Sequence, residues 1–218
     1  MRFMIGATQA EMAIDRLIVA GWTGRDAATV EHHIEELAAL GVAPPSQVPL
    51  FYRVAASLLT QEPCIEVLGD HTSGEAEPLL VQRDERCWLG LASDHTDRAL
   101  EAQSVAASKQ VCAKPCADEL WDFAEVEGHL DALELRSWIA SGQGDWTLYQ
   151  EGALAAIRPL GALRTAGGLS DGAAMLCGTL GAIGGVRPAT RFRATLTDPV
   201  LSREIALEYT TATLPVIS

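Results

Sequence analysis

Residues 73–81 read SGEAEPLLV, and this short segment bears on both the fold and the chemistry of the chain. Its apolar second half predicts a β-strand over residues 75–82. Alternate side chains of a strand point to the same face, so Glu75 and Glu77 are expected to lie side by side. Two carboxylates held that close repel each other unless water solvates them or a cation lies between them. The segment therefore predicts either an exposed acidic strand face or part of a metal site.

A second acidic cluster follows the next predicted strand. Residues 87–93 form an apolar run, and residues 93–98 read SDHTDR at its end. If this strand pairs with the strand over residues 75–82, Asp94 approaches the two glutamates and completes a site of oxygen ligands. Oxygen ligands favour hard cations such as Mg²⁺, Mn²⁺ or Ca²⁺ over Zn²⁺. The alternative is that Asp94 is an ordinary turn or cap residue, a role in which aspartate is common.

The clearest helix is predicted over residues 27–40. Asp26 is suited to be its N-cap and Gly41 to follow its last turn, and apolar residues recur between them at helical spacing. His33 and Glu36 are three positions apart on one face of this helix, so the carboxylate can orient the imidazole. A neighbouring carboxylate raises the basicity of a histidine and suits it to act as a general base. A histidine at the edge of an apolar stripe also occurs for purely structural reasons.

A glycine-rich turn is the fourth motif. Residues 175–185 read MLCGTLGAIGG, which predicts a strand that runs into the turn. Backbone N–H groups of such a turn can approach a ligand closely. No Gly-Lys-Ser or Gly-Lys-Thr sequence follows, and the glycine spacing does not match a dinucleotide-binding fingerprint. The turn is therefore either a ligand-binding loop or a tight connection between two strands.

Most of the remaining chain follows a pattern of short strands separated by turns. The candidate strands cover residues 16–20, 64–68, 75–82, 87–93, 129–139, 147–150, 173–177, 191–196 and 204–211. A second helix, broken by Pro159, is expected over residues 153–165, and residues 97–109 are expected to form a helix or an irregular turn. The sequence thus predicts one predominantly β domain with an N-terminal helical segment.

The composition narrows the classes of function. The chain has 218 residues, 48% of them hydrophobic, with 16 basic and 29 acidic side chains and a formal charge of −13. So acidic a protein is poorly suited to neutralise phosphates, which argues against a nucleic-acid partner. No apolar window is long enough for a membrane span, and acidic residues interrupt any signal-peptide core near the N-terminus. Five scattered cysteines indicate reduced thiols, and the expected location is the cytoplasm.

Taken in order, the four motifs resemble those of the fumarylacetoacetate hydrolase superfamily, over roughly residues 16–215. The superfamily pattern has a His-x-x-Glu helix, a Phe-x-Lys segment, a Glu-x-Glu strand, an Asp-x-Thr-x-Arg-Asp segment, a lysine, a Gln-Asp-Gly segment and a Thr-Gly-Thr-Pro turn. The matching positions in this chain are His33 to Glu36, Phe51 to Arg53, Glu75 to Glu77, Asp94 to Glu101, Lys109, Gln150 to Gly152, and Cys177 to Leu180.

The chain also departs from that pattern. Four positions carry a different residue: Arg53 for lysine, Ala99 for aspartate, Ala153 for asparagine and Leu180 for proline. The interval between Asp94 and Lys109 is slightly short, so Lys114 is an alternative for the lysine position. The sequence is therefore identified as a divergent branch, whose substrate need not be an acylpyruvate or a fumarylacetoacetate.

The resemblance implies a mixed α/β fold that is predominantly β, a β-sandwich or roll with a short helical lid segment. A single domain is expected over residues 1–218, with the N-terminal strand and the lid in residues 1–50 and the β-rich metal-binding core in residues 51–218. Members of the superfamily usually assemble as homodimers, so a homodimer is expected as well.

The resemblance also implies an activity, namely hydrolysis of a C–C bond in a 2-oxo acid or a 1,3-dicarbonyl compound. Glu75, Glu77 and Asp94 are the implied ligands of Mg²⁺ or Mn²⁺, with Ca²⁺ as a substitute in crystals, and the metal would stabilise the enolate that is left. Two alternatives stay open at this point. One is a decarboxylase or tautomerase that uses the same site, and the other is a non-catalytic domain that binds a small molecule with the metal.

The remaining roles follow from the same resemblance. His33, oriented by Glu36, is the implied catalytic base that activates water. Lys109 is expected to hold the developing oxyanion or the carboxylate of a small-molecule substrate. The implied substrate-binding positions are Arg53, Arg98, Gln150, Gly178 and Thr179.

Overall fold

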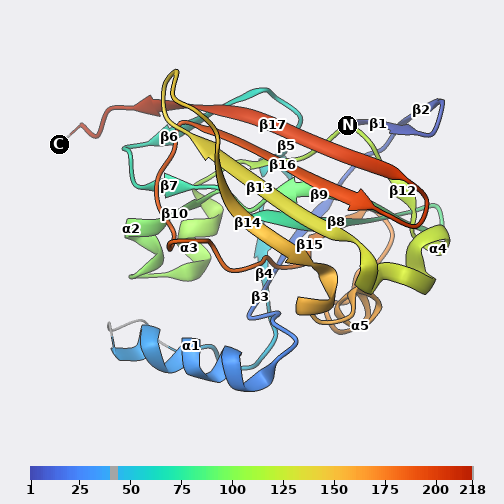
Figure 1. Cartoon of the computed structure of the whole chain (residues 1–218), viewed down its shortest axis with the longest axis horizontal. Helices are drawn as coiled ribbons and strands as arrows, with labels where there is room; N and C mark the ends of the chain where they lie inside the picture. The colour runs from blue at the N-terminus through green and yellow to red at the C-terminus, as the bar shows by residue number, and fades with distance from the viewer. Residues whose placement is uncertain (40–43, 218) are drawn as a thin grey trace.

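The computed structural model describes residues 1–39 and 44–217, except for the side chains of His33, Glu36, Leu37 and Ala39. Its main feature is a pair of β-sheets packed face to face (Figure 1). The six-stranded sheet has the order β12 (Trp121–Asp122), β9 (Arg86–Ser93), β8 (Ala76–Arg83), β15 (Ala173–Leu176), β3 (Arg16–Gly21), β4 (Leu50–Val54). The five-stranded sheet has the order β14 (Thr147–Ala153), β13 (Glu134–Ala140), β16 (Arg191–Asp198), β17 (Arg203–Leu214), β6 (Cys64–Leu68). This arrangement confirms the predominantly β sandwich that the sequence predicts.

Both sheets are mixed, and their burial patterns differ. The strand β15 runs parallel to β3, and β17 runs parallel to β6, whereas the other pairs within the two sheets are antiparallel. The strands β8 and β9 are buried at nearly every position, because both faces of the six-stranded sheet are covered at its centre. By contrast, β13 and β16 alternate buried and more exposed side chains. The five-stranded sheet therefore turns one face to the core and one to solvent.

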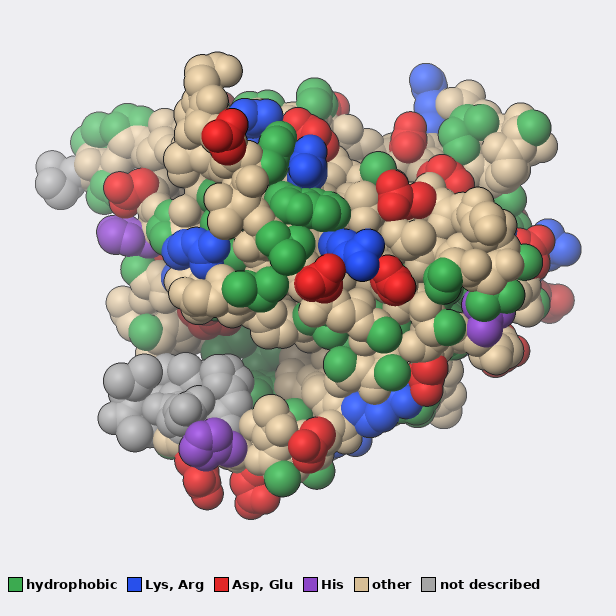
Figure 2. Space-filling view, in the orientation of Figure 1, with side chains coloured by type: hydrophobic (Ala, Val, Ile, Leu, Met, Phe, Trp, Pro, Cys, Tyr) green, Lys and Arg blue, Asp and Glu red, His purple; other side chains and the backbone are tan. Residues whose placement is uncertain are grey.

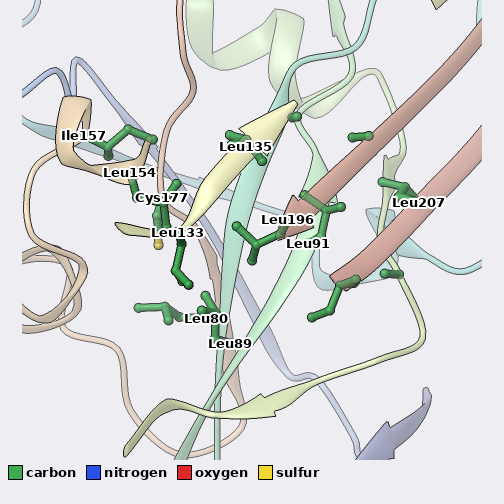
Figure 3. Packing of buried hydrophobic residues seen from close by; sticks show 14 of the residues in the cluster. Leu80, Leu89, Leu91, Leu133, Leu135, Leu154, Ile157, Cys177, Leu196 and Leu207 are labelled. Atoms are coloured by element: carbon green, nitrogen blue, oxygen red, sulfur yellow. The ribbon is translucent and has the colours of Figure 1, made fainter. Parts of the chain in front are cut away.

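Leucine is the commonest residue in the core between the sheets. Leu80, Leu89 and Leu91 of the six-stranded sheet belong to one buried cluster with Leu135 and Leu196 of the five-stranded sheet (Figure 3). On the outer face of the molecule seen in Figure 2, acidic and basic side chains are interspersed instead. Apolar residues thus fill most of the space between the sheets.

A second cluster covers the opposite face of the six-stranded sheet. Leu17 of β3 and Leu79 and Val81 of β8 pack there with Phe3, which is fully buried in the hairpin of β1 (Arg2–Ile5) and β2 (Thr8–Glu11). Because side chains alternate along a strand, residues 75 and 77 lie on the same face as Leu79 and Val81. The two glutamates of the sequence motif therefore point away from the core between the sheets.

Shorter elements complete the chain. Two further strand pairs are β7 (Thr72–Ser73) with β10 (Thr96–Asp97), and β5 (Leu59–Thr60) with β11 (Lys114–Pro115). The α-helices are α1 (Ala27–Ala39), α2 (Arg98–Glu101), α3 (Val105–Gln110), α4 (Phe123–Val126) and α5 (Leu160–Ala166). The 3₁₀ helices are η1 (Ala56–Leu58), η2 (Glu127–Ala132) and η3 (Leu154–Ala156). Within the part of the chain that the structure describes, no helix is long and apolar enough to span a bilayer.

The helix α1 begins as the sequence predicts. The Asp26 carboxylate accepts hydrogen bonds from the backbone N–H of Ala28, at 3.0 Å, and from the hydroxyl of Thr29, at 2.9 Å. This is the geometry of an N-cap. The predicted end of the helix, Gly41, lies outside the described residues. In Figure 1, α1 lies beneath the two sheets, next to the ends of β3 and β4.

The strand predicted over residues 129–139 is wrong in its first half. Residues Glu127–Ala132 form η2, and β13 begins only at Glu134. His129 explains the difference, because its Nε2 lies 3.0 Å from Oδ1 of Asp198. This pairing with the end of β16 draws residue 129 away from the strand path.

Truncation of Leu80 tests the core between the sheets. Leu80 is fully buried, so Leu80→Ala leaves a cavity and is expected to lower the free energy of unfolding by about 2–5 kcal/mol in urea denaturation. Leu201→Ala is the matched control, since Leu201 is 47% exposed and its loss is expected to cost about 0.5 kcal/mol or less. Equal losses in the two variants would contradict this placement of the core.

Candidate metal centre

The pairing of β8 with β9 brings the predicted acidic triad together. Ala76 lies opposite Ser93 at the end of the strand pair. Just beyond this pair, the backbone N–H of Asp94 donates to the carbonyl of Glu75 at 2.9 Å. One carboxylate oxygen from each of Glu75, Glu77 and Asp94 lies within 4.8 Å of the other two. Glu77 and Asp94 are buried, and the Glu75 side chain is 15% exposed. The structure therefore places all three carboxylates on one face at the end of two adjacent strands.

Two lysines neutralise Asp94 from opposite sides. The ammonium of Lys109, on α3, contacts Oδ2 of Asp94. The ammonium of Lys114, on β11, lies 3.1 Å from Oδ1 and donates to the carbonyl of His95 at 2.6 Å. These are the only two lysines in the sequence, since its other basic residues are arginines. The two candidates for the lysine position thus both lie at the triad.

Arg98 supplies the third positive charge. Its Nη2 lies 3.2 Å from Oε2 of Glu75, and its Nη1 lies 2.8 Å from Oε2 of Glu101. Its Nε donates to the hydroxyl of Ser73 at 2.7 Å. The sequence predicts that Arg98 binds substrate, whereas in the structure its guanidinium pairs with two glutamates of the chain. Arg98 therefore acts first to neutralise and orient Glu75.

Burial and charge shift the carboxyl pKa values of Glu77 and Asp94 in opposite directions. Burial raises the pKa of Glu77 well above its ordinary value, and the negative charge of Asp94 raises it further. Burial alone would also raise the pKa of Asp94, but the charges of Lys109 and Lys114 outweigh it and hold that pKa below its usual range. Asp94 therefore keeps its negative charge, whereas loss of the proton from Glu77 is made less favourable.

The glycine-rich turn contacts the triad through its backbone. The N–H of Gly178 donates to Oε2 of Glu77 at 2.7 Å. Gly178 has a φ of +93°, and a Cβ at this position would lie 1.6 Å from the Thr23 hydroxyl oxygen. Only glycine can make this approach, so Gly178 orients Glu77 as well as ending the strand.

Gln150 and its partner Thr179 have a supporting role. The Oε1 of Gln150 accepts from the backbone N–H of Ala76 and the hydroxyl of Ser137, and its Nε2 donates to the Thr179 hydroxyl and the Leu180 carbonyl. Thr179 in turn donates to the Ala76 carbonyl at 2.8 Å. Gln150 is fully buried, and its two donors and two acceptor positions are all used within the protein. In the structure Gln150 therefore fixes the start of β8, and its contact with substrate stays a prediction.

Tyr52, and not Arg53, is the residue of β4 that faces the triad. Arg53 is exposed, whereas the ring centroid of Tyr52 lies 5.8 Å from the Lys109 ammonium. Adjacent side chains of a strand point to opposite faces, so the placing of Tyr52 directs Arg53 away from the carboxylates. The structure therefore does not bring Arg53 to the triad, and its role in substrate binding stays a prediction. A one-residue difference along the strand decides this, and no motif signals it.

Tyr209 connects the triad to the five-stranded sheet. Its hydroxyl lies 2.8 Å from Nδ1 of His95 and 2.9 Å from the hydroxyl of Ser93. The other ring nitrogen of His95 lies 2.8 Å from the Thr72 hydroxyl. Burial, followed by the charge of Lys114, lowers the pKa of His95 to about 3, so the ring is neutral. Ser93 and His95 are the neighbours of Asp94 in the sequence. The sequence motifs predicted no role for either of them or for Tyr209.

His33 and Glu36 occupy the helix that the sequence predicts. Both belong to α1, but their side chains lie outside the described part of the structure. The assignment of His33 as a base oriented by Glu36 stays a prediction from the sequence.

Comparisons with known proteins agree with the fold. The model of a family described as "Protein of unknown function (DUF2848)" matches residues 20–209. No curated protein matches the chain. The crystal structure of Cg1458 is similar at a TM-score of 0.63 and 12% identity, with 95% of this chain and 78% of that chain covered. A hexagonal crystal form of 2-keto-3-deoxyarabinonate dehydratase is similar at 0.64 and 14%, with 93% and 75% covered. These likenesses establish a fumarylacetoacetate hydrolase-like fold.

The raised pKa of Glu77 predicts a pH dependence of stability in the metal-free protein. A carboxyl whose pKa is higher in the folded than in the unfolded state stabilises the fold at low pH, and this contribution is lost as pH rises through the folded pKa. As pH rises above the ordinary carboxyl pKa of about 4.3 toward the raised pKa of folded Glu77, wild-type protein is expected to lose stability relative to Glu77→Gln, by at most about 1.4 kcal/mol per pH unit. Urea denaturation with a chelator present, at a series of pH values, measures this difference.

Two controls accompany that measurement. Glu66→Gln changes an exposed glutamate of β6 and is expected to keep the pH dependence of the wild type. Asp94 adds no slope in this range, because its pKa is lowered. A constant difference between wild type and Glu77→Gln across the range would show that Glu77 titrates like an ordinary glutamate.

Proposed function

We propose that this chain, which belongs to the DUF2848 family of proteins of unknown function, is a divalent-metal-dependent enzyme that acts on a 2-oxo acid or a 1,3-dicarbonyl compound. The convergence of the Glu75, Glu77 and Asp94 oxygens within 4.8 Å is the observation that carries this proposal. Three carboxylates this close, two of them buried, repel one another, and a bound hard cation would remove that repulsion. The residues present therefore fit Mg²⁺ or Mn²⁺ as the cofactor.

The surrounding groups of the chain would fix the metal ligands in place. The Gly178 N–H holds one oxygen of Glu77, Arg98 holds Glu75, and Lys114 holds one oxygen of Asp94. Such contacts to the ligands normally raise metal affinity, because they orient the carboxylates before binding. A bound divalent ion would act as a Lewis acid that polarises a carbonyl oxygen of the substrate.

The charges around the triad favour an anionic substrate. Lys109, Lys114 and Arg98 balance the three carboxylates before any metal is counted. Addition of a divalent ion gives the site an excess of positive charge, even with Glu101 paired to Arg98. An acid such as a 2-oxo carboxylate restores the balance, and Lys109 is the cation that we assign to its carboxylate or developing oxyanion.

Hydrolysis of a C–C bond is the reaction that we propose first. It requires a base that removes a proton from water, and we assign His33, with Glu36 as its orienting partner, on the basis of their spacing in α1. His95 is unsuited to this task, because its two ring nitrogens are taken by Tyr209 and Thr72. We therefore do not assign the base to His95, although it lies next to Asp94.

Dehydration of a 2-keto acid is the second candidate. The name of one structural neighbour, 2-keto-3-deoxyarabinonate dehydratase, supports it. Dehydration and C–C hydrolysis share a need to polarise the keto group, so the same triad suits both. Decarboxylation and tautomerisation of a 2-oxo acid also share this need, and a non-catalytic metal-dependent binding protein would show none of these reactions.

Metal dependence of turnover tests the proposed function. Purified protein is incubated with acylpyruvates, oxaloacetate and 2-keto-3-deoxy sugar acids, with Mg²⁺ or Mn²⁺ or with a chelator. We expect consumption of at least one compound that the chelator abolishes. Asp94→Asn is expected to lower turnover at least about 100-fold, since even groups that only support a metal ligand typically contribute 10–100-fold.

Glu66→Gln is the matched control, because it neutralises an exposed acid of the other sheet and is expected to leave turnover unchanged. The products, analysed by mass spectrometry, separate hydrolysis from dehydration and decarboxylation. Metal-induced thermal stabilisation with no turnover of any compound would favour the binding protein instead.

Replacement of His33 tests the assignment of the base. His33→Ala is expected to lower the rate of hydrolysis by about 10²–10⁴-fold, the usual contribution of a general base. His32→Ala removes the adjacent, exposed histidine of α1 and serves as the control. Equal rates for His33→Ala and wild type would rule out His33 as the base and leave the metal site unaffected.

The homodimer and the cytoplasmic location stay predictions.

A further inference from the structure

Lys109 lies between the acidic triad and the ring of Tyr52. Its side chain is only 8% exposed, and its ammonium contacts Oδ2 of Asp94. The negative charges of Glu75 and Glu77 also attract this ammonium. On its other side, the Tyr52 ring centroid is 5.8 Å from Nζ. A compact positive charge thus lies against the same three carboxylates that we propose as metal ligands.

Lys114 differs from Lys109 in how it is held. Its ammonium is anchored by a backbone carbonyl, that of His95, as well as by Oδ1 of Asp94. It is fully buried in the strand pair of β5 with β11. Lys109 extends instead from the short helix α3, and the hydrogen bond described for its ammonium is to Asp94. Lys114 is therefore a fixed part of the fold, whereas Lys109 is held by the charge of the triad.

Resting on the proposed metal-dependent function, we infer that Lys109 is the resident cation of the metal-free triad and that its ammonium leaves the triad when a divalent ion binds. The metal affinity of the protein is then set by competition between Lys109 and the metal for the same carboxylates. Lys109 is in this sense a residue that determines metal affinity, in addition to any contact that it makes with substrate.

Electrostatics requires one cation to give way. An ammonium and a divalent ion that share the oxygens of Asp94 lie within a few ångströms of each other, and in a buried site their repulsion is only weakly screened. The four-carbon stem of lysine is flexible, so Lys109 can withdraw while α3 stays in place. The face of the Tyr52 ring is an alternative partner for the displaced ammonium. Exchange of one cation for the other keeps the carboxylates neutralised in both states.

Lysine suits this role better than arginine does. Its ammonium is a compact point charge, comparable to a small cation, whereas a guanidinium is a broad planar group. The other basic residues of the chain are arginines, and the ammonium groups of both lysines pair with the Asp94 carboxylate. This distribution also makes the inference unusually easy to test.

Lysine-selective ¹⁵N labelling of the full chain gives only two Nζ signals, because the sequence has two lysines. Loss of one signal in Lys109→Met assigns both. On titration of metal-free protein with Mg²⁺, we expect the Lys109 signal to move toward that of a free lysine or to broaden through exchange with water. The Lys114 signal is expected to keep its position and its protection. A Lys109 signal that is unchanged at saturating Mg²⁺ would overturn the inference.

Calorimetric titration with Mn²⁺ provides a second readout that needs no substrate. Lys109→Met keeps most of the length of the side chain and removes its charge, so it is expected to bind Mn²⁺ about tenfold more tightly than wild type, or better. Lys109→Arg keeps the charge and is expected to bind no more tightly than wild type. Circular dichroism shows whether each variant is folded, and the labelling experiment on wild type decides the matter if either is not.

The outcomes separate this inference from the proposed function. Absence of metal binding to wild type and to Lys109→Met would remove both. Metal binding that leaves the Lys109 signal unchanged, or that is not tightened in folded Lys109→Met, would remove the inference alone. Displacement of Lys109 by Mg²⁺ with no turnover of any tested compound would support the inference and contradict the proposed reaction.

Discussion

Three carboxylates on one sheet face, each with an oxygen within 4.8 Å of the others, create an electrostatic cost that the surrounding structure must offset. The chain offsets it with three cations from three different elements, because Arg98 lies on α2, Lys109 on α3 and Lys114 on β11. Each of these elements is short and has little stability of its own. The segment between residues 94 and 115 therefore brings all three cations to the triad.

The position of the triad on the sheet gives it access to chemistry without disturbing the core. Glu77 lies on the face of β8 that also carries Leu79, and not on the face that packs against the five-stranded sheet, and Glu75 comes just before the strand. Leu80 and its neighbours can therefore fill the space between the sheets with apolar side chains alone. Polar contacts from Gly178 and Gln150 are added only at the start of the strand, where the backbone needs partners.

Much of this arrangement is predictable from residue patterns, and the failures have physical causes. Strand alternation predicts that Glu75 lies beside Glu77. The approach of Asp94 depends in addition on the pairing of two neighbouring strands, which the family resemblance supported and the structure shows. Periodicity does not reveal which side of an edge strand meets the site, so it did not show that Tyr52, and not Arg53, lies beside Lys109. Tyr209 was missed because it lies more than a hundred residues from His95 in the sequence and alternates like any other strand residue.

Tyr209 has a consequence for the architecture as a whole. Its phenol belongs to β17, yet it holds His95 and Ser93, the residues on either side of Asp94. The six-stranded sheet carries every acid of the triad but lacks this support from the other layer. Grafting the acidic strands onto a smaller scaffold would therefore reproduce the ligands without the brace that sets the backbone between them. In this protein, the second layer of the sandwich is as much a component of the site as the layer that bears the acids.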